Sequence, residues 1–146
     1  MKTGSLNYRY GFTIIELIVV IAIISVLAAI VLVNVTGYIN KGKDAAIKGN
    51  LSSLMVDAAV ILDSYGSYDN PANVNTYICG KTWTVINAAI YSAGGAGVCG
   101  NSADTWCASA TLKANSGNSF CVDYTGLKKE AAAEVCDETD GVWACP

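Results

Sequence analysis

The chain has 146 residues, of which 53% are apolar and only 14% are charged, whereas soluble domains average about 25% charged residues. Much of the shortfall lies between Ile14 and Val33, where Glu16 is the one charged residue. Nine basic and twelve acidic residues give a net charge of −3, with no basic stripe and no His. These features exclude a simple cytosolic globule and a multi-pass transporter, and they argue against nucleic-acid binding and against an enzyme.

The first predicted element is an apolar helix. Every residue from Leu17 to Val33 is apolar except Ser25, and thirteen of these seventeen residues are Leu, Ile or Val. As a helix the run rises about 25 Å, which approaches the thickness of the hydrocarbon core of a membrane. The transfer free energy of its aliphatic residues, about −4 to −8 kcal/mol in sum, outweighs the cost of Glu16 at its edge. We therefore expect this segment to cross a membrane.

The flanks of the run indicate its orientation. Lys2 and Arg9 precede it and favour a cytoplasmic N-terminus, although three lysines follow between positions 41 and 48. The cysteines described below require the C-terminal part to lie outside, so we expect an N-in, C-out topology. A signal peptide cut near residues 26–28 and a plain membrane anchor are the alternatives. Neither explains Glu16, because an ionisable residue in a spanning segment marks a functional site.

Glu16 requires a positively charged partner, and a cut just before Phe12 would create one. The new amine would lie four residues upstream of Glu16, and residues four apart share a helix face. The amine could then pair with Glu16 in the same or in a neighbouring subunit. This deduction gives a local hypothesis for the role of the carboxylate.

The seven residues 11–17 read GFTIIEL and lead directly into the apolar run. This segment resembles the prepilin signature of type IV pilins and type II secretion pseudopilins. The resemblance implies that a membrane aspartyl peptidase cuts between Gly11 and Phe12 and that Phe12 becomes N-methylated. It also implies that Glu16 sets subunit registration by pairing with the amine of an adjacent subunit in a filament core.

The resemblance further implies an organisation in four segments: a cleaved leader at 1–11, a membrane and filament-core helix at 12–36, its amphipathic continuation at 37–66, and a disulfide-bonded extracytoplasmic head at 67–146. The expected function is that of a structural subunit of a type IV pilus-like filament for adhesion, motility or uptake. We expect the chain to be a single-pass protein of the cytoplasmic membrane before assembly and part of a filament at the cell surface afterwards. No catalytic residue and no cofactor are expected.

The expected partners are identical or related pilin subunits, the prepilin peptidase, and an inner-membrane assembly platform with its ATPase motor. No nucleic acid is expected. Two alternatives to a pilus subunit remain open at this point: a pseudopilin of a type II secretion or DNA-uptake system, and a monomeric membrane-anchored binding module.

Helical periodicity continues beyond the membrane segment. Apolar residues at three- and four-residue spacing form a stripe that we expect to pack in the core of the head: Ile47, Leu51, Leu54, Met55, Ala58, Leu62 and Tyr65. Charged residues such as Asp44 and Asp57 fall mostly off this stripe. Gly66 and the following Asp69-Asn70-Pro71 cluster should end the helix at Tyr65.

The head should contain a β-hairpin. Residues 105–113 alternate, residues 115–118 form a turn, and residues 119–124 return as a second strand. One face of the first strand is apolar and carries Trp106, Ala108, Ala110 and Leu112. Residues 82–91 lean towards a helix, and residues 94–100 are expected to be a Gly-rich loop without phosphate-binding features. The fold class is α+β and pilin-like, with a long N-terminal helix packed on a small antiparallel sheet.

All six cysteines follow the apolar run: Cys79, Cys99, Cys107, Cys121, Cys136 and Cys145. Their gaps contain no C-x-x-C pair, which argues against a zinc or thioredoxin-like site. An even number in a small extracytoplasmic domain indicates three disulfides. The acidic segment 137–141 lacks the ligand pattern of an EF-hand, so we expect a solvated turn there and no metal, with a calcium ion as the alternative.

We expect each cysteine to pair with its neighbour in the chain, as Cys79–Cys99, Cys107–Cys121 and Cys136–Cys145. The second pair is supported by the hairpin, because direct cross-strand partners have β-carbons about 4.5–5.5 Å apart. The third pair would close a loop of ten residues, counting both cysteines. The first pair follows by elimination.

Overall fold

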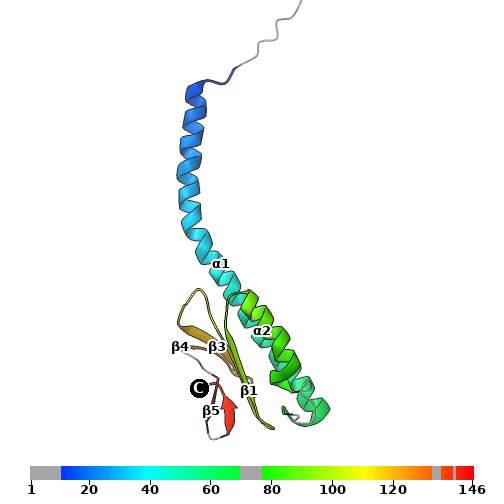
Figure 1. Cartoon of the computed structure of the whole chain (residues 1–146). Coiled ribbons are helices and arrows are strands. Elements are labelled where there is room, and N and C mark those ends of the chain that lie inside the picture. The colour runs from blue at the N-terminus through cyan, green and yellow to red at the C-terminus, as the bar shows by residue number, and fades with distance from the viewer. Residues whose placement is uncertain (1–10, 70–76, 133–135, 140) are drawn as a thin grey trace, which may run out of the picture. The chain divides into compact units, whose positions relative to one another are not determined.

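The computed structural model describes residues 11–69, 77–132, 136–139 and 141–146. The chain divides into two compact units, Met1–Gly37 and Tyr38–Pro146, and each is described by itself. Figure 1 labels several of the elements. In chain order they are α1 (Ile14–Tyr65), the π-helical turn η1 (Ile78–Thr82), α2 (Trp83–Ser92), β1 (Gly97–Asn101), β2 (Trp106–Thr111), β3 (Asn118–Asp123), β4 (Lys128–Ala132), β5 (Asp137–Thr139) and β6 (Val142–Ala144).

The first unit contains the apolar part of α1. This helix is long and apolar enough to cross a membrane, as expected. Every described side chain from Gly11 to Gly37 is exposed. The polar side chains of the run bond within the helix, since Ser25 Oγ donates to the carbonyl of Ile21 at 2.7 Å and Asn34 Nδ2 to that of Ile30 at 3.2 Å. Such internal bonding is what a lipid or protein interior demands of polar groups.

The second unit buries one face of the remaining part of α1. Four expected core residues of the stripe are buried: Ile47, Leu51, Leu54 and Ala58. The expectation is wrong for the last turn, where Leu62 is 40% exposed and Tyr65 is 55% exposed, whereas Ile61 is buried. With 3.6 residues per turn, either position 61 or position 62 can follow Ala58 on the buried face of the helix. In this structure it is position 61. Tyr65 is the last helical residue, and Gly66 follows with a φ of +70°.

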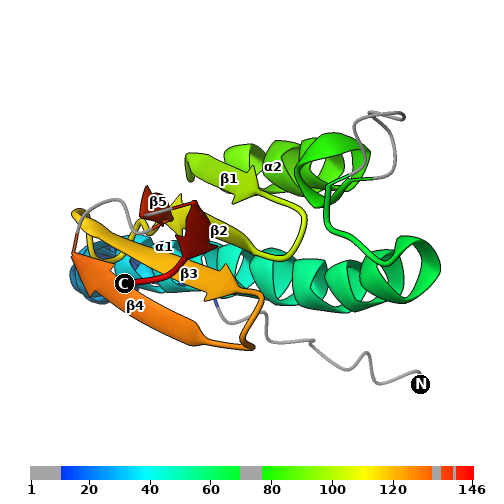
Figure 2. The same cartoon turned by 90° about the horizontal axis from the view of Figure 1, so that it is seen from below.

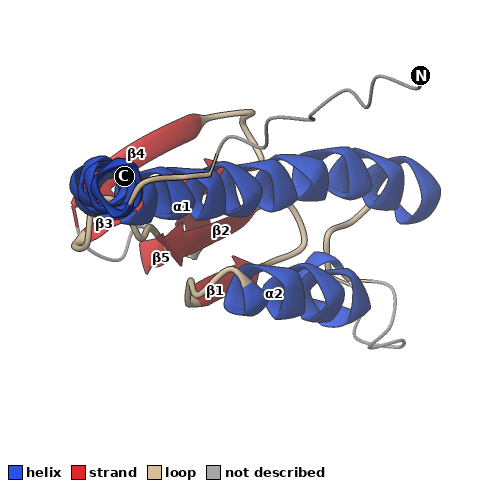
Figure 3. Cartoon of the chain, turned by 90° about the horizontal axis from the view of Figure 1, so that it is seen from above, coloured by secondary structure: helices blue, strands red, loops and turns tan. Residues whose placement is uncertain are grey.

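The expected hairpin is confirmed as β2 and β3, which belong to a four-stranded antiparallel sheet of order β1-β2-β3-β4. The inward face of β2 and the residue after it lie in the core with α1, as expected: Trp106, Ala108, Ala110 and Leu112. The expected helix at 82–91 is also confirmed as α2. Figure 2 shows α2 beside β1, and Figure 3 shows β4 and α2 on opposite sides of the C-terminal part of α1.

The segment 94–100 is not a loop throughout, because its second half forms the edge strand β1. Two of its glycines provide the space for large aromatic rings. A Cβ atom at Gly100 would lie 2.0 Å from the ring of Trp143, and one at Gly97 would lie 2.8 Å from Trp83. Glycine, usually unfavourable in strands, is required here by the close approach of these rings.

The disulfide Cys79–Cys99 is confirmed and joins η1 to β1. The other two expected pairings are wrong, since the bonds are Cys107–Cys136 and Cys121–Cys145. In the β2–β3 register, Cys107 lies opposite Asp123 and Cys121 lies opposite Ser109. The two cysteines are therefore diagonal neighbours, about 7–8 Å apart, beyond the reach of a disulfide.

The partners of these two cysteines come from a second, two-stranded sheet. Cys136 precedes β5 and Cys145 follows β6, so both flank the same hairpin. Each bonds to the four-stranded sheet, and the four sulfur-bearing residues form a buried cluster of their own. The two bonds attach the C-terminal hairpin to the sheet face that does not contact α1.

Two buried carboxylates hold turns in place. Asp44 was expected on the solvated side of α1, but it is buried, and its oxygens accept hydrogen bonds from the backbone N–H groups of Lys113 at 2.5 Å and Ala114 at 3.0 Å. Asp123 accepts from the N–H and hydroxyl of Thr125 and from the N–H of Cys145. These bonds link the β2–β3 turn to α1 and the C-terminus to β3.

Candidate processing and assembly site

The expected cleavage and assembly residues lie at the start of α1. Gly11, Phe12 and Thr13 precede the helix, which begins at Ile14. Thr13 occupies the N-cap position. Its Oγ1 accepts a hydrogen bond from the backbone N–H of Glu16 at 3.3 Å, and Glu16 Oε2 in return accepts from the backbone N–H of Thr13 at 2.9 Å. A third bond, from the Thr13 hydroxyl to the same carboxylate oxygen, measures 2.8 Å.

This reciprocal arrangement is a capping box. It satisfies backbone N–H groups at the N-terminus of a helix, which otherwise lack partners, and it places a negative charge near the positive end of the helix dipole. The pattern Thr-x-x-Glu at 13–16 was visible in the sequence. The role predicted for Glu16 from the sequence, as the partner of an amine, does not include this contact with Thr13.

The expected cleavage position is exposed and lies outside regular secondary structure. A Cβ atom at Gly11 would have no other atom within 4 Å, so the fold itself does not require a glycine. Phe12 is 78% exposed, although its aromatic side chain is strongly apolar. The bond between these two residues is thus sterically open to a peptidase. Lys2 and Arg9 of the expected leader lie outside the described residues.

The structure brings Glu16 close to Thr13 and leaves Phe12 before the first helical residue. In the uncut chain Phe12 thus lies outside the helix, and the sharing of a helix face with Glu16, which we expect after cleavage, stays a prediction. Cleavage would turn the nitrogen of Phe12 into a charged amine one residue before the cap. The pairing of this amine with Glu16 stays a prediction.

Cysteines and acidic side chains are the remaining residue types that could bind a metal ion. The six cysteines are all disulfide-bonded. Within the described parts of the chain, no group of three Asp, Glu or Cys side chains is placed to hold a metal ion. Of the acidic segment 137–141, residues 137–139 form β5, and Asp140 lies outside the described residues.

Comparisons with known proteins bear on both ends of the chain. Residues 6–32 match a family model described as the prokaryotic N-terminal methylation motif. Fimbrial protein Q of Moraxella bovis is 32% identical over 142 residues, a match that covers 96% of this chain and 87% of the relative. The type IV major alpha-pilin of Moraxella bovis is 32% identical over 150 residues, covering 96% and 86%. No solved structure gives a significant match. The similarity therefore extends over the head as well as the helix.

Proposed function

This chain belongs to the type IV pilin family, and on that premise we propose that it is the structural subunit of a type IV pilus-like filament and not an enzyme. Membership in the family implies polymerisation with related pilins. The observation that carries the proposal is the first unit, an apolar helix with every described side chain exposed and one carboxylate in its first turn. Such a helix needs a lipid or protein environment to cover it.

We place maturation at the bond between Gly11 and Phe12. A prepilin peptidase cuts there, and Phe12 becomes N-methylated, in line with the methylation motif that covers residues 6–32. The exposure of Phe12 and the open space around Gly11 support access to this bond. The cut converts an uncharged peptide nitrogen into a cation close to Glu16, whose carboxylate the cap already holds at that end of the helix.

Glu16 then acts as the registration residue of assembly. An unpaired carboxylate in a low-dielectric filament core is costly, and an amine from an adjacent subunit offsets that cost. The aliphatic side chains supply the driving force, because each contributes about 1.5–3 kcal/mol when its apolar surface is fully buried. The carboxylate–amine pair selects the register, and apolar burial stabilises the fibre.

Before assembly the subunit spans the cytoplasmic membrane with its N-terminus inside and its head outside. Three disulfides in the head support an oxidising compartment for that part. Extraction from the membrane requires an assembly platform and an ATPase motor, because the chain itself shows no nucleotide-binding motif. The relatives are a fimbrial protein and a pilin, which favours a surface pilus used for adhesion, motility or uptake over a secretion pseudopilus.

Mass spectrometry of the mature chain from filament-producing cells tests this function. The expected product begins at Phe12, carries one additional methyl group at its N-terminus and retains three disulfides. A mature chain that still begins at Met1 would contradict the proposal and favour a plain membrane anchor.

A further inference from the structure

The head is basic at the end where the chain enters it from the apolar run. Lys41 and Lys43 lie on α1 and Lys113 follows β2, and all three side chains are exposed. Within the described residues, none of the three takes part in an ion pair. Lys41 Nζ lies 5.9 Å from the centre of the Tyr38 ring, which is itself 71% exposed. We call this surface of Lys41, Lys43 and Lys113 the basic end.

The fold holds Lys113 at this end. Its backbone N–H and that of Ala114 donate to the carboxylate of Asp44, which fixes the β2–β3 turn against α1. A Cβ atom at Gly94 would lie 2.9 Å from Lys113 Cε, so the lysine side chain runs beside the C-terminus of α2. The negative end of a helix dipole stabilises a nearby cation. The position of this lysine is thus part of the folded structure.

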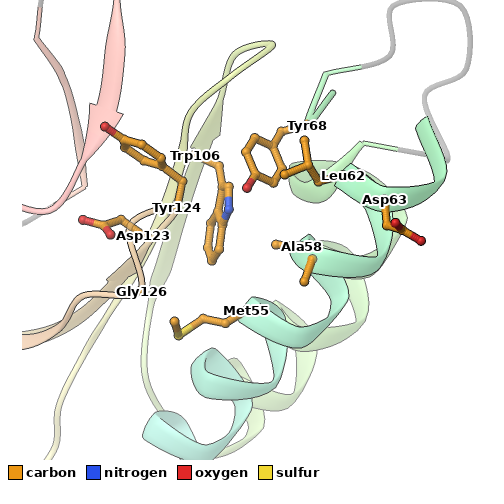
Figure 4. A pocket seen from close by; sticks show the side chains of 10 residues that line it. Met55, Ala58, Leu62, Asp63, Tyr68, Trp106, Asp123, Tyr124 and Gly126 are labelled. Carbon is orange, nitrogen blue, oxygen red and sulfur yellow. The ribbon is translucent and has the colours of Figure 1, made fainter. Parts of the chain in front are cut away.

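The opposite end of the head is acidic. Asp63 and Asp123 line a pocket of about 390 Å³ there, beside Trp106 at the start of β2 (Figure 4). Asp104 precedes the same strand, whereas Lys113 follows it. We call the surface of Asp63, Asp104 and Asp123 the acidic end. The charges of the head are therefore separated along the strands.

The acids near the basic end do not cancel its charge. Glu130 pairs with Lys48, and Asp44 is buried. Four lysines thus stand against two acids, a net charge of +2: Lys41, Lys43, Lys48, Lys113, Asp44 and Glu130. In the rest of the head, three lysines stand against seven acids among the described residues. A negatively charged surface therefore attracts the basic end and repels the acidic end.

The chain itself keeps the basic end near a membrane. The apolar run ends at Val33, and Lys41 follows eight residues later. Eight residues rise about 12 Å as a helix and span at most about 29 Å when extended. The headgroup layer is about 5–8 Å deep on each side of the hydrocarbon core, and charges act over a Debye length of about 8 Å at physiological ionic strength. A helical connection thus brings Lys41 within reach of charges on the membrane surface.

We propose that the basic end docks on the anionic phospholipid headgroups of the leaflet from which the helix emerges. The lysine ammonium groups pair with lipid phosphates, and Tyr38 lies at the headgroup level, where tyrosines are enriched. The inference rests on the proposed function, because it requires that the subunit spans the membrane before assembly. Docking holds the unassembled head in one orientation, with its acidic end away from the membrane.

The placement of the lysines favours lipid over a protein partner. Lys41 and Lys43 are two residues apart on α1, so their side chains point about 200° apart around the helix axis. Headgroups surround an emerging helix and can contact both lysines, whereas a single protein surface covers one side of a helix.

Photo-cross-linking of the full chain tests the docking. A photoreactive amino acid replaces Asn115, an exposed residue of the β2–β3 turn, and the chain is reconstituted in vesicles of phosphatidylcholine or of equimolar phosphatidylcholine and phosphatidylglycerol. Mass spectrometry should find lipid adducts in the mixed vesicles and far fewer in phosphatidylcholine. Salt at 1 M shortens the Debye length to about 3 Å and should suppress the adducts. The same probe at Leu127, exposed in the β3–β4 turn, is the control and should give none.

Variants of single lysines give an independent measurement. Lys43→Gln should reduce the yield of lipid adducts about fivefold, since a lysine near an anionic surface contributes about 1 kcal/mol. Lys128→Gln is the matched control, because this exposed lysine lies at the start of β4, beside the β3–β4 turn, and its loss should leave the yield unchanged. Thermal unfolding of both variants checks that the head is folded.

The outcomes separate this inference from the proposed function. Equal yields in the two kinds of vesicle, or in Lys43→Gln and the unmodified chain, would overturn the docking. Adducts from position 115 that map to a second copy would also overturn it, because the basic end would then meet the acidic end of a neighbour. A chain that alkaline carbonate removes from the vesicles does not span them, and both proposals fail. A chain that resists carbonate and forms no lipid adduct refutes the docking alone.

Discussion

The two units of this pilin differ in where their stability comes from. From Gly11 to Gly37 every described side chain is exposed, and the helix is stabilised in isolation only by its own hydrogen bonds and the cap at Thr13. The head between Tyr38 and Pro146 has a buried core, three disulfides and the buried carboxylates of Asp44 and Asp123. The head therefore buries its own core within a single chain, whereas the apolar surface of the helix is covered only among lipids or copies of itself.

The largest expected effect concerns the junction before the helix. Gly11→Ala should abolish processing and leave the precursor in the membrane, because we assign the glycine to recognition by the peptidase. The fold has room for the added methyl group, with no atom within 4 Å. Immunoblots of membrane fractions measure the ratio of precursor to mature chain. Gly37→Ala, which is equally unobstructed, is the control and should be processed normally.

A chain with Gly11→Ala that is cut and assembled like the unmodified chain would show that the cleavage site is assigned wrongly. The mature helix would then begin at a residue other than Phe12.

The disulfides give the next largest effect, and it should be confined to the head. Replacing both Cys121 and Cys145 by Ser should destabilise the head by about 2–5 kcal/mol, since the bond closes a chain separation of 24 residues. Denaturant unfolding of the mature chain in detergent measures the change. The helical signal of the apolar segment should persist beyond the unfolding of the head. Loss of both signals together would contradict the separation of the two units.

A smaller effect is expected at Gly100, on whose backbone the ring of Trp143 packs. Gly100→Ala would place a methyl group 2.0 Å from that ring and should destabilise the head by about 1–3 kcal/mol. Gly49→Ala provides the matched control, because it lies in α1 with open space around it and should stabilise the helix by about 1 kcal/mol. Equal unfolding midpoints for both variants would refute the assigned contact between Gly100 and Trp143.

A comparable effect, confined to one turn, should come from Asp44. Asp44→Ala leaves the N–H groups of Lys113 and Ala114 without their acceptor and should cost about 1–3 kcal/mol. Hydrogen exchange of these two amides, compared with the exposed control Asp57→Ala, locates the change. Unchanged protection of both amides in Asp44→Ala would contradict the role of this carboxylate in holding the β2–β3 turn.

The sequence predicted those parts of the fold whose determinants are local. The apolar run predicts the first part of α1 by composition, the three- and four-residue spacing predicts its continuation, and Gly66 follows its last residue. The strict alternation from Trp106 to Leu112, followed by a polar turn, predicted the β2–β3 hairpin and its inward face. In each case residues close in the chain carry the whole pattern, so periodicity was sufficient.

The failures involve contacts between distant segments. The bonds Cys107–Cys136 and Cys121–Cys145 depend on how the β5–β6 hairpin lies on the sheet, which spacing does not reveal. Strand β1 was missed because its glycines make room for rings that come from other parts of the chain. The burial of Asp44 has no local signal in the sequence, because its partners lie 69 and 70 residues away.

At the candidate site, the roles that the sequence assigns to Gly11, Phe12 and Glu16 stay predictions, and residues 6–32 match the N-terminal methylation motif. The contact between Glu16 and Thr13 is not part of that prediction. The capping box between Thr13 and Glu16 adds a second role for the carboxylate. Helix capping and subunit registration are therefore two explanations for the same glutamate, and a single substitution can separate them.

The number and length of filaments formed by Glu16→Gln test the central claim most directly. Glutamine retains an acceptor for the Thr13 N–H and is itself a capping-box residue, but it removes the charge that pairs with the Phe12 amine. The account predicts normal membrane insertion, cleavage before Phe12 and a folded head, together with a severe loss of filaments, since breaking one side of a buried ion pair costs about 3–5 kcal/mol. Filaments of unmodified number and length from a correctly cleaved Glu16→Gln chain would contradict it.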